Sequence, residues 1–253
     1  MESIAQSQTP PPGPEATLSL GSRFVAVFAR PARAWTGLER RGQWWFPMLV
    51  AMIVTLAGAL AIYQRALVPM GLDQIQRQVE SGQMPPESAA QAERAMSSPV
   101  MMAVQVGMQT VAVPVMTLLI ALLPWLVAGF MLGFRFRYRD AFVVTSWAGL
   151  VTLPASVLTY ALAWVNQTMT TVHTGFGVLL PVEDPPSKLM VGLGTFLDQG
   201  IGPFSLWYVA VMGLGAAALS GAPARRVLIA LGGLWIVAWI IFSALAMLFA
   251  PGA

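Results

Sequence analysis

Long apolar runs alternate with polar breaks along most of the chain, and this pattern predicts five membrane-spanning helices. The runs cover residues 44–63, 100–134, 142–165, 201–219 and 227–249. A helix of about 20 apolar residues crosses a hydrocarbon core of ~30 Å, because each residue adds ~1.5 Å. Four of the runs have about that length. We therefore predict an all-α, polytopic membrane bundle of five transmembrane helices, formed by residues 44–249.

The second run is too long for a single simple crossing. Its 35 uncharged residues would make a helix of ~52 Å. A tight hairpin of two spans is one alternative, but the middle of the run lacks a Gly, Asn or Asp turn cluster. The pattern favours one long helix, kinked at Pro114 or Pro124 and projecting beyond one face of the bilayer.

The segment before the first run divides into two parts. Residues 1–17 are rich in proline and lack apolar periodicity, which predicts a disordered cytoplasmic tail. Residues 18–43 interleave aromatic and basic side chains; Ser19 or Ser22 could cap one short helix and Pro31 could open a second. These amphipathic juxtamembrane helices could lie on anionic lipid, or they could be solvated with arginines that only obey membrane topology.

Two longer polar segments separate the spans. Residues 64–98 predict short helices at 72–80 and 86–96, and the later segment predicts another at 186–197. Acidic residues in the first segment are accompanied by arginines, so we interpret it as a solvated loop and not a metal site. His173 is the only histidine and has no carboxylate near it in sequence, which is typical of an ordinary loop residue.

A few polar, small or irregular positions lie inside the spans. Gln105 and Gln109 share a helix face, where they could bond a neighbouring helix or line a polar path; helix contact is favoured. Pro154 predicts a kink in the third span, with a nearby hydroxyl bonding the freed carbonyl. In the fourth span, small residues at 213, 217 and 221 form a smooth ridge that favours close helix packing.

Composition narrows the class further. Hydrophobic residues make up 57% of the chain and charged residues 10%, with a mean hydropathy of +0.68, which excludes an ordinary soluble protein. The absence of cysteine excludes disulfides, thiolate catalysis and cysteine-ligated metals. The net charge of +3 is too small and too scattered for a nucleic-acid partner. No catalytic residue, metal site or cofactor is predicted.

The distribution of basic residues predicts the orientation. With five spans, ten of the 14 Lys and Arg residues fall on the side of the N-terminus, which should be cytoplasmic. The N-terminus is then inside, the C-terminus outside, and the location a cell (inner) membrane. A hairpin at 100–134 would send the three arginines after it outward. The candidate lipid-contacting residues at this end are Arg23, Arg30, Arg33, Trp35, Arg40, Arg41, Arg135, Arg137 and Arg139.

Three stretches resemble the Yip1 family, and its bacterial branch in particular. They are FARP at 28–31 with Trp35, Leu38 and WWFP at 44–47; RYRDAFVVTSWAGLVTLP at 137–154; and FSLWYVAVMGLGAAALSGAPARRV at 204–227. The resemblance runs from Arg23 to Phe249 and covers all five spans. Trp147 stands where the family more often has tyrosine. The tail lacks the Asp-Leu-x-Gly-Pro type motif of eukaryotic relatives that act with small GTPases.

The resemblance implies a non-enzymatic integral membrane protein. The leading hypothesis is a membrane-organising or partner-binding scaffold that contacts anionic lipid headgroups and a membrane protein or a second copy. The alternative is a transporter or channel component for a small, largely uncharged solute, with Gln105 and Gln109 as polar lining. Because no acidic, basic or histidine side chain lies inside a span, coupled transport and membrane-embedded catalysis are disfavoured.

Overall fold

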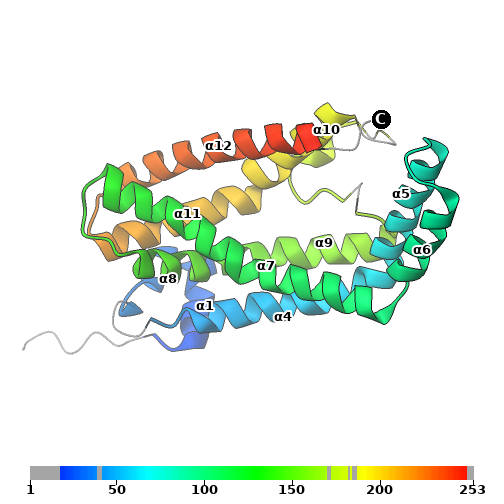
Figure 1. Ribbon diagram of the computed structural model, residues 1–253. Coiled ribbons are helices and arrows are strands. Elements are labelled where there is room, and N and C mark those ends of the chain that lie inside the picture. Colours follow the sequence, from blue (N-terminus) through cyan, green and yellow to red (C-terminus); the bar gives the residue numbers. More distant parts are fainter. Residues whose placement is uncertain (1–17, 39–41, 170–171, 182, 184–186, 250–253) are drawn as a thin grey trace, which may run out of the picture.

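The computed structural model of the chain describes residues 18–38, 42–169, 172–181, 183 and 187–249, and these form helices and loops without a strand (Figure 1). Five of the helical segments are long and apolar enough to cross a membrane: Trp45–Glu80, Pro99–Met131, Tyr138–Asn166, Pro203–Ser220 and Ala224–Phe249. The predicted five-span helical architecture is therefore confirmed. The predicted tail at residues 1–17 lies outside the described residues, as do Arg40 and Arg41.

The first span has 36 residues, more than the ~20 that a membrane crossing requires, and it ends in a helical hairpin. Helix α4 (Trp45–Ile62) passes through a π-helical turn, η1 (Tyr63–Leu67), into α5 (Val68–Glu80), against which α6 (Pro86–Met96) packs. The Tyr63 hydroxyl donates to the carbonyl of Met96, with 2.9 Å between the oxygens. This bond fixes the hairpin at one end of the bundle (Figure 1).

The second span is a single long helix. It begins at α7 (Pro99–Trp125), where the Ser98 hydroxyl accepts from the Met101 backbone N–H at 3.2 Å, and continues into the π-helical segment η2 (Leu126–Met131). The two-span hairpin is thereby excluded. Pro114 lies within regular α-helix, whereas the irregular π segment begins directly after Pro124 and Trp125.

The third span is interrupted near its middle. Helix α8 (Tyr138–Gly149) passes through a short 3-10 turn, η3 (Leu150–Thr152), into α9 (Leu153–Asn166), whose second residue is Pro154. The Thr152 hydroxyl donates to the Gly149 carbonyl at 2.8 Å. The α-helix thus breaks at the predicted proline, and a neighbouring hydroxyl bonds an adjacent carbonyl.

The last two spans form an antiparallel pair. A short 3-10 turn, η4 (Phe176–Leu179), precedes α10 (Lys188–Thr195), the π-helical turn η5 (Phe196–Gly200), α11 (Pro203–Ser220) and α12 (Ala224–Phe249). Gly221 has φ +73°, the left-handed conformation that ends α11 at little steric cost. A Cβ on Gly213 would lie 2.6 Å from Leu228 Cδ2, so this part of the predicted ridge packs against α12.

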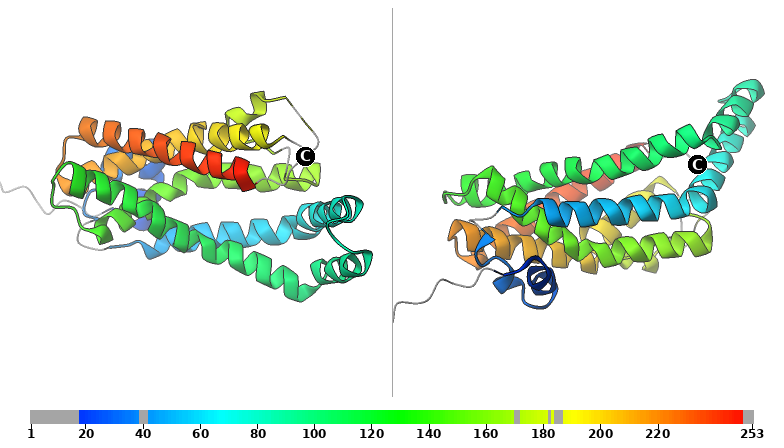
Figure 2. Two further views of the ribbon diagram at one scale, coloured as in Figure 1. Left: turned by 45° about the horizontal axis from the view of Figure 1, so that its top comes forward. Right: turned by 90° about the horizontal axis from the view of Figure 1, so that it is seen from below.

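The main hydrophobic core lies toward the end of the bundle that carries the N-terminal helices. Helices α1 (Leu20–Ala29) and α2 (Pro31–Ala34) fold against α8 and α11 there, and Ser19 caps α1. Trp147, Met212 and Leu231 are fully enclosed in this cluster. Figure 2 shows α1 at the same end of the bundle as the α7–α8 and α11–α12 connections.

Candidate functional site

Exposed arginines gather at the end of the bundle that carries α1 and α2. In the connection between α7 and α8, Arg135, Arg137 and Arg139 are exposed while Phe136 between them is buried. The Tyr138 hydroxyl donates to the Leu118 carbonyl at 2.7 Å, which holds this connection against α7. The alternation therefore directs the aromatic residues inward and presents the arginines as a row.

Other exposed arginines extend this basic end. Arg30 precedes α2 and Arg33 lies within it, and Arg225 and Arg226 lie in the first turn of α12. Across the ranges that the structure describes, none of these side chains forms an ion pair with an acidic residue. The charge at this end is therefore available to an external anion.

Arg23 and Trp35 occupy a different environment, because both are buried. Arg23 is 1% exposed, and its guanidinium donates to the Ala34 carbonyl and to the Thr36 carbonyl, the latter at 3.1 Å. The guanidinium carbon also lies 5.7 Å from the ring centroid of Trp147. Burial lowers the pKa of Arg23, but an arginine stays charged at neutral pH.

Trp35 is 3% exposed and fits against α11 at a glycine. A Cβ on Gly215 would lie 2.7 Å from Trp35 Cζ2 and 2.8 Å from Val144 Cγ1, so only glycine leaves room for the indole. In this arrangement Arg23 and Trp35 join the N-terminal helices to the bundle. Both side chains are enclosed by protein in this structure, so the exposed arginines are the candidates that remain accessible for the predicted lipid contact.

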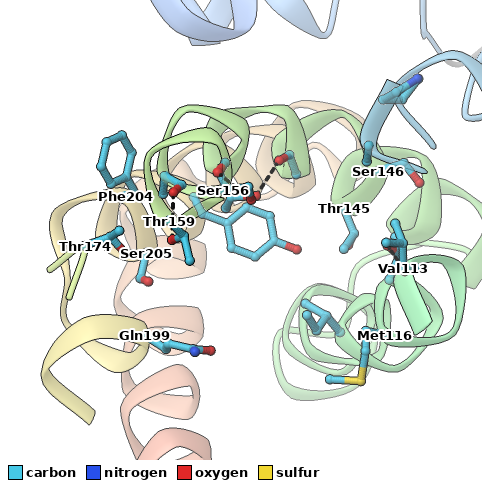
Figure 3. Close-up of a pocket in the computed structure, with 18 of the residues that line it drawn as sticks. Val113, Met116, Thr145, Ser146, Ser156, Thr159, Thr174, Gln199, Phe204 and Ser205 are labelled. Carbon is cyan, nitrogen blue, oxygen red and sulfur yellow. Dashed lines mark hydrogen bonds between the residues drawn. The ribbon is translucent and has the colours of Figure 1, made fainter. Parts of the chain in front are cut away.

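A partly open cavity of about 380 Å³, with both polar and apolar lining residues, lies between the helices and is lined by residues from all five spans (Figure 3). The third span contributes a stripe of polar and small residues at alternating intervals of four and three: Thr145, Gly149, Thr152, Ser156 and Thr159. This spacing places the stripe on one helix face. In Figure 3, Gln199 extends toward the cavity from η5, with Val113 and Met116 on the opposite side.

A histidine and a carboxylate are paired beside this cavity. His173 Nδ1 lies 2.7 Å from Asp198 Oδ2, and Asp198 Oδ1 accepts from the backbone N–H groups of Gly175 and Gly177, each at 3.0 Å. Asp198 and Thr174 both line the cavity. The carboxylate thus holds the loop after α9 against η5.

The two intramembrane glutamines differ in their surroundings. Gln109 lines a second, smaller cavity of about 270 Å³, which shares Ser156 and Thr159 with the first. Gln105 lines neither cavity. Within the described residues neither amide has a hydrogen-bond partner, and no group of three or more histidine or acidic residues could hold a metal ion.

Comparison with protein families decides the identity of the fold. A family model described as the Yip1 domain matches residues 25–247, which is most of the chain. The chain belongs to the Yip1 family. Comparison with curated proteins and with solved structures gives no match. The protein is a Yip1 family, multi-pass membrane protein.

Two features of this Yip1 domain were not found by reasoning from the sequence. The stripe of polar and small residues in the third span has a signal in its spacing, because positions 145, 149, 152, 156 and 159 share a helix face, but its hydroxyls were considered only as possible partners at the Pro154 kink. The pairing of His173 with Asp198 had no such signal, since 25 residues separate the partners. The closely spaced glycines at 175 and 177 were the only local sequence feature that pointed to this pairing.

Proposed function

We propose that this Yip1 family protein is a non-enzymatic membrane scaffold whose basic end binds anionic lipid headgroups. In doing so it organises the membrane or holds a membrane partner there. The observation that carries the proposal is the set of exposed arginines at one end of the bundle, which have no acidic partner within the described ranges. They are Arg30, Arg33, Arg135, Arg137, Arg139, Arg225 and Arg226.

Elementary electrostatics supports this assignment. An exposed arginine presents a planar fork of donors that matches a phosphate group. Each basic residue close to an anionic leaflet contributes roughly 1 kcal/mol of attraction. The row at 135, 137 and 139 is held by the buried Phe136 and by the Tyr138 bond to α7, so its three guanidinium groups are positioned together.

The same proposal fixes the orientation. Because the basic end should face the cytoplasm, the N-terminus lies inside, the C-terminus outside, and the location is a cell (inner) membrane. A reporter enzyme that works only outside the cytoplasm should be active when it is fused after Ala253. Activity of a cytoplasm-only reporter at that position would contradict the orientation.

Lipid retention in nanodiscs tests the headgroup proposal. Wild-type protein is reconstituted with phosphatidylcholine and increasing phosphatidylglycerol, and native mass spectrometry counts the anionic lipids that stay bound. We expect the triple variant R135Q/R137Q/R139Q to bind phosphatidylglycerol at least tenfold more weakly. The matched control is R77Q/R94Q, which removes exposed arginines from α5 and α6 at the opposite end.

Two results would contradict the headgroup proposal. One is equal retention of phosphatidylcholine and phosphatidylglycerol by the wild-type protein. The other is an equal loss of affinity in the triple variant and in the control. The partner-binding part is tested separately by pull-down from native membrane in mild detergent, where a partner lost in the triple variant supports it.

A further inference from the structure

The cavity lined by all five spans is a feature of the bundle that the proposed lipid contact at the basic end does not use. One residue from each span illustrates its lining: Ala51, Thr117, Thr152, Ser205 and Trp239. Its volume of about 380 Å³ lies within the range of small-molecule sites, roughly 300–1,000 Å³. Side chains do not fill this space, so the helices lose the close-packed contacts that a filled core would provide.

The hydroxyl groups of the lining offer acceptors more than donors. Thr152, Ser156 and Thr159 each donate their proton to a carbonyl of their own helix, at 2.8, 3.2 and 2.9 Å. Thr117 does the same toward the Val113 carbonyl at 2.8 Å. A hydroxyl that has donated its only proton still has lone pairs to accept with. The cavity therefore suits a molecule that brings hydrogen-bond donors.

Tyr208 supplies independent evidence for a missing partner. It lines the cavity and is only 7% exposed, yet its hydroxyl makes no hydrogen bond with any described residue. The Gln199 amide, which belongs to an exposed residue and extends into the cavity in Figure 3, also has no partner among the described residues. The Tyr208 hydroxyl thus keeps both a donor and an acceptor for a molecule in the cavity. A ligand that carries hydroxyl groups could bond it.

Charge and shape limit the chemical class of this ligand. Asp198 is the only acidic or basic residue among the described lining residues, and its carboxylate is already engaged by His173 and two backbone N–H groups. A charged ligand would find no free counter-ion inside the bilayer. Phe204 and Trp239 add apolar wall beside the polar stripe. The lining thus favours an uncharged, hydroxyl-bearing molecule with an apolar part.

We propose that the cavity binds an uncharged polyol group of the glycerol type. Glycerol hydroxyls would donate to the acceptor stripe and bond Tyr208, while an ester or acyl portion would lie on the apolar wall. The same group occurs in free polyols and in the head of a monoacylglycerol that enters from the bilayer. The experiment below separates these two sources.

The test uses full-length protein in phosphatidylcholine nanodiscs and a 1-monoacylglycerol with a photoreactive acyl chain. Wild-type protein should be labelled saturably. Tyr208→Phe should weaken binding about three- to tenfold, with stability unchanged because no protein hydrogen bond is lost. Thr152→Val with Thr159→Val should weaken binding by at least as much. The matched control is Thr110→Val, since Thr110 also donates to its own helix, at 2.8 Å, but lines neither cavity.

Competition then identifies the source of the polyol. Displacement of the label by free glycerol indicates a soluble polyol, whereas displacement only by unlabelled monoacylglycerol indicates a bilayer lipid; both support the class. The proposal is overturned by labelling that does not saturate, or by a lysophosphatidylcholine of the same chain length that competes equally well. Equal losses in Tyr208→Phe and Thr110→Val would also overturn it.

Discussion

The two halves of the third span, α8 and α9, belong to one candidate membrane span but pack very differently. Seven of the 12 residues of α8 are buried, whereas only Ala163 is buried among the 14 residues of α9. Helix α8 is enclosed by α7, α11 and the N-terminal helices, while α9 packs mainly on α4 and faces the cavity with its hydroxyls. Apolarity therefore brings a segment into the bilayer, and steric fit decides how tightly it is enclosed.

Loss of Arg23 should loosen the dense half most. Arg23→Met removes the donors to the buried carbonyls of Ala34 and Thr36, at ~1–3 kcal/mol for each unpaired group. We expect the local opening free energy of residues 20–29, measured by hydrogen exchange, to fall by about 3 kcal/mol. The exposed Arg30→Met is the control and should change it by less than ~0.5 kcal/mol. Similar protection in both variants would show that Arg23 does not hold these helices.

Overfilling the same region should have a smaller effect. Gly215→Leu forces a side chain into Trp35 and Val144, and such overpacking costs about 1–3 kcal/mol. The free energy of unfolding, measured by SDS titration in mixed micelles, should fall by about 2 kcal/mol. Gly107→Leu is the matched control, because no described atom lies within 4 Å of its added Cβ. Equal destabilisation by the two substitutions would show that the contact between Trp35 and Gly215 does not require a glycine.

A substitution on the cavity face should act in the opposite direction. Gly149 is helical, lines the cavity and has no described atom within 4 Å of an added Cβ. Gly149→Ala should raise the free energy of unfolding by about 0.5–1 kcal/mol, since alanine favours the helix. Gly215→Ala should lower it in the same titration. A loss of stability in Gly149→Ala would mean that the cavity is closed around this glycine.

Much of the fold could be predicted because the bilayer imposes simple length and charge rules. The single helix at 99–131 followed from two arguments: the run lacks a turn cluster, and Arg135, Arg137 and Arg139 would otherwise lie outside. Pro154 marked the break in the third span. These features depend on local sequence and on the solvent, so a single chain contains enough information to find them.

What could not be predicted depends on contacts between distant segments. Helices that rest on lipid and helices that dock on the bundle would show the same aromatic and basic pattern at residues 18–38. Trp35 packs against the bundle because Gly215 leaves room for its indole, and that space cannot be read from residues 18–38. The π-helical turns at 63–67, 126–131 and 196–200 also have no reliable local signature. The open space beside Gly149 could not be predicted either, because the positions of the four other spans create it.

The docking of α1 and α2 also sets an order of assembly during synthesis. Trp35 leaves the ribosome early, but its seat at Gly215 is part of the fourth span, which is made much later. Arg23 completes its stacking only when Trp147 of the third span is present. The first segment to be synthesised therefore completes its packing only after the fourth span has been made. Its docking requires that the third and fourth spans have come together.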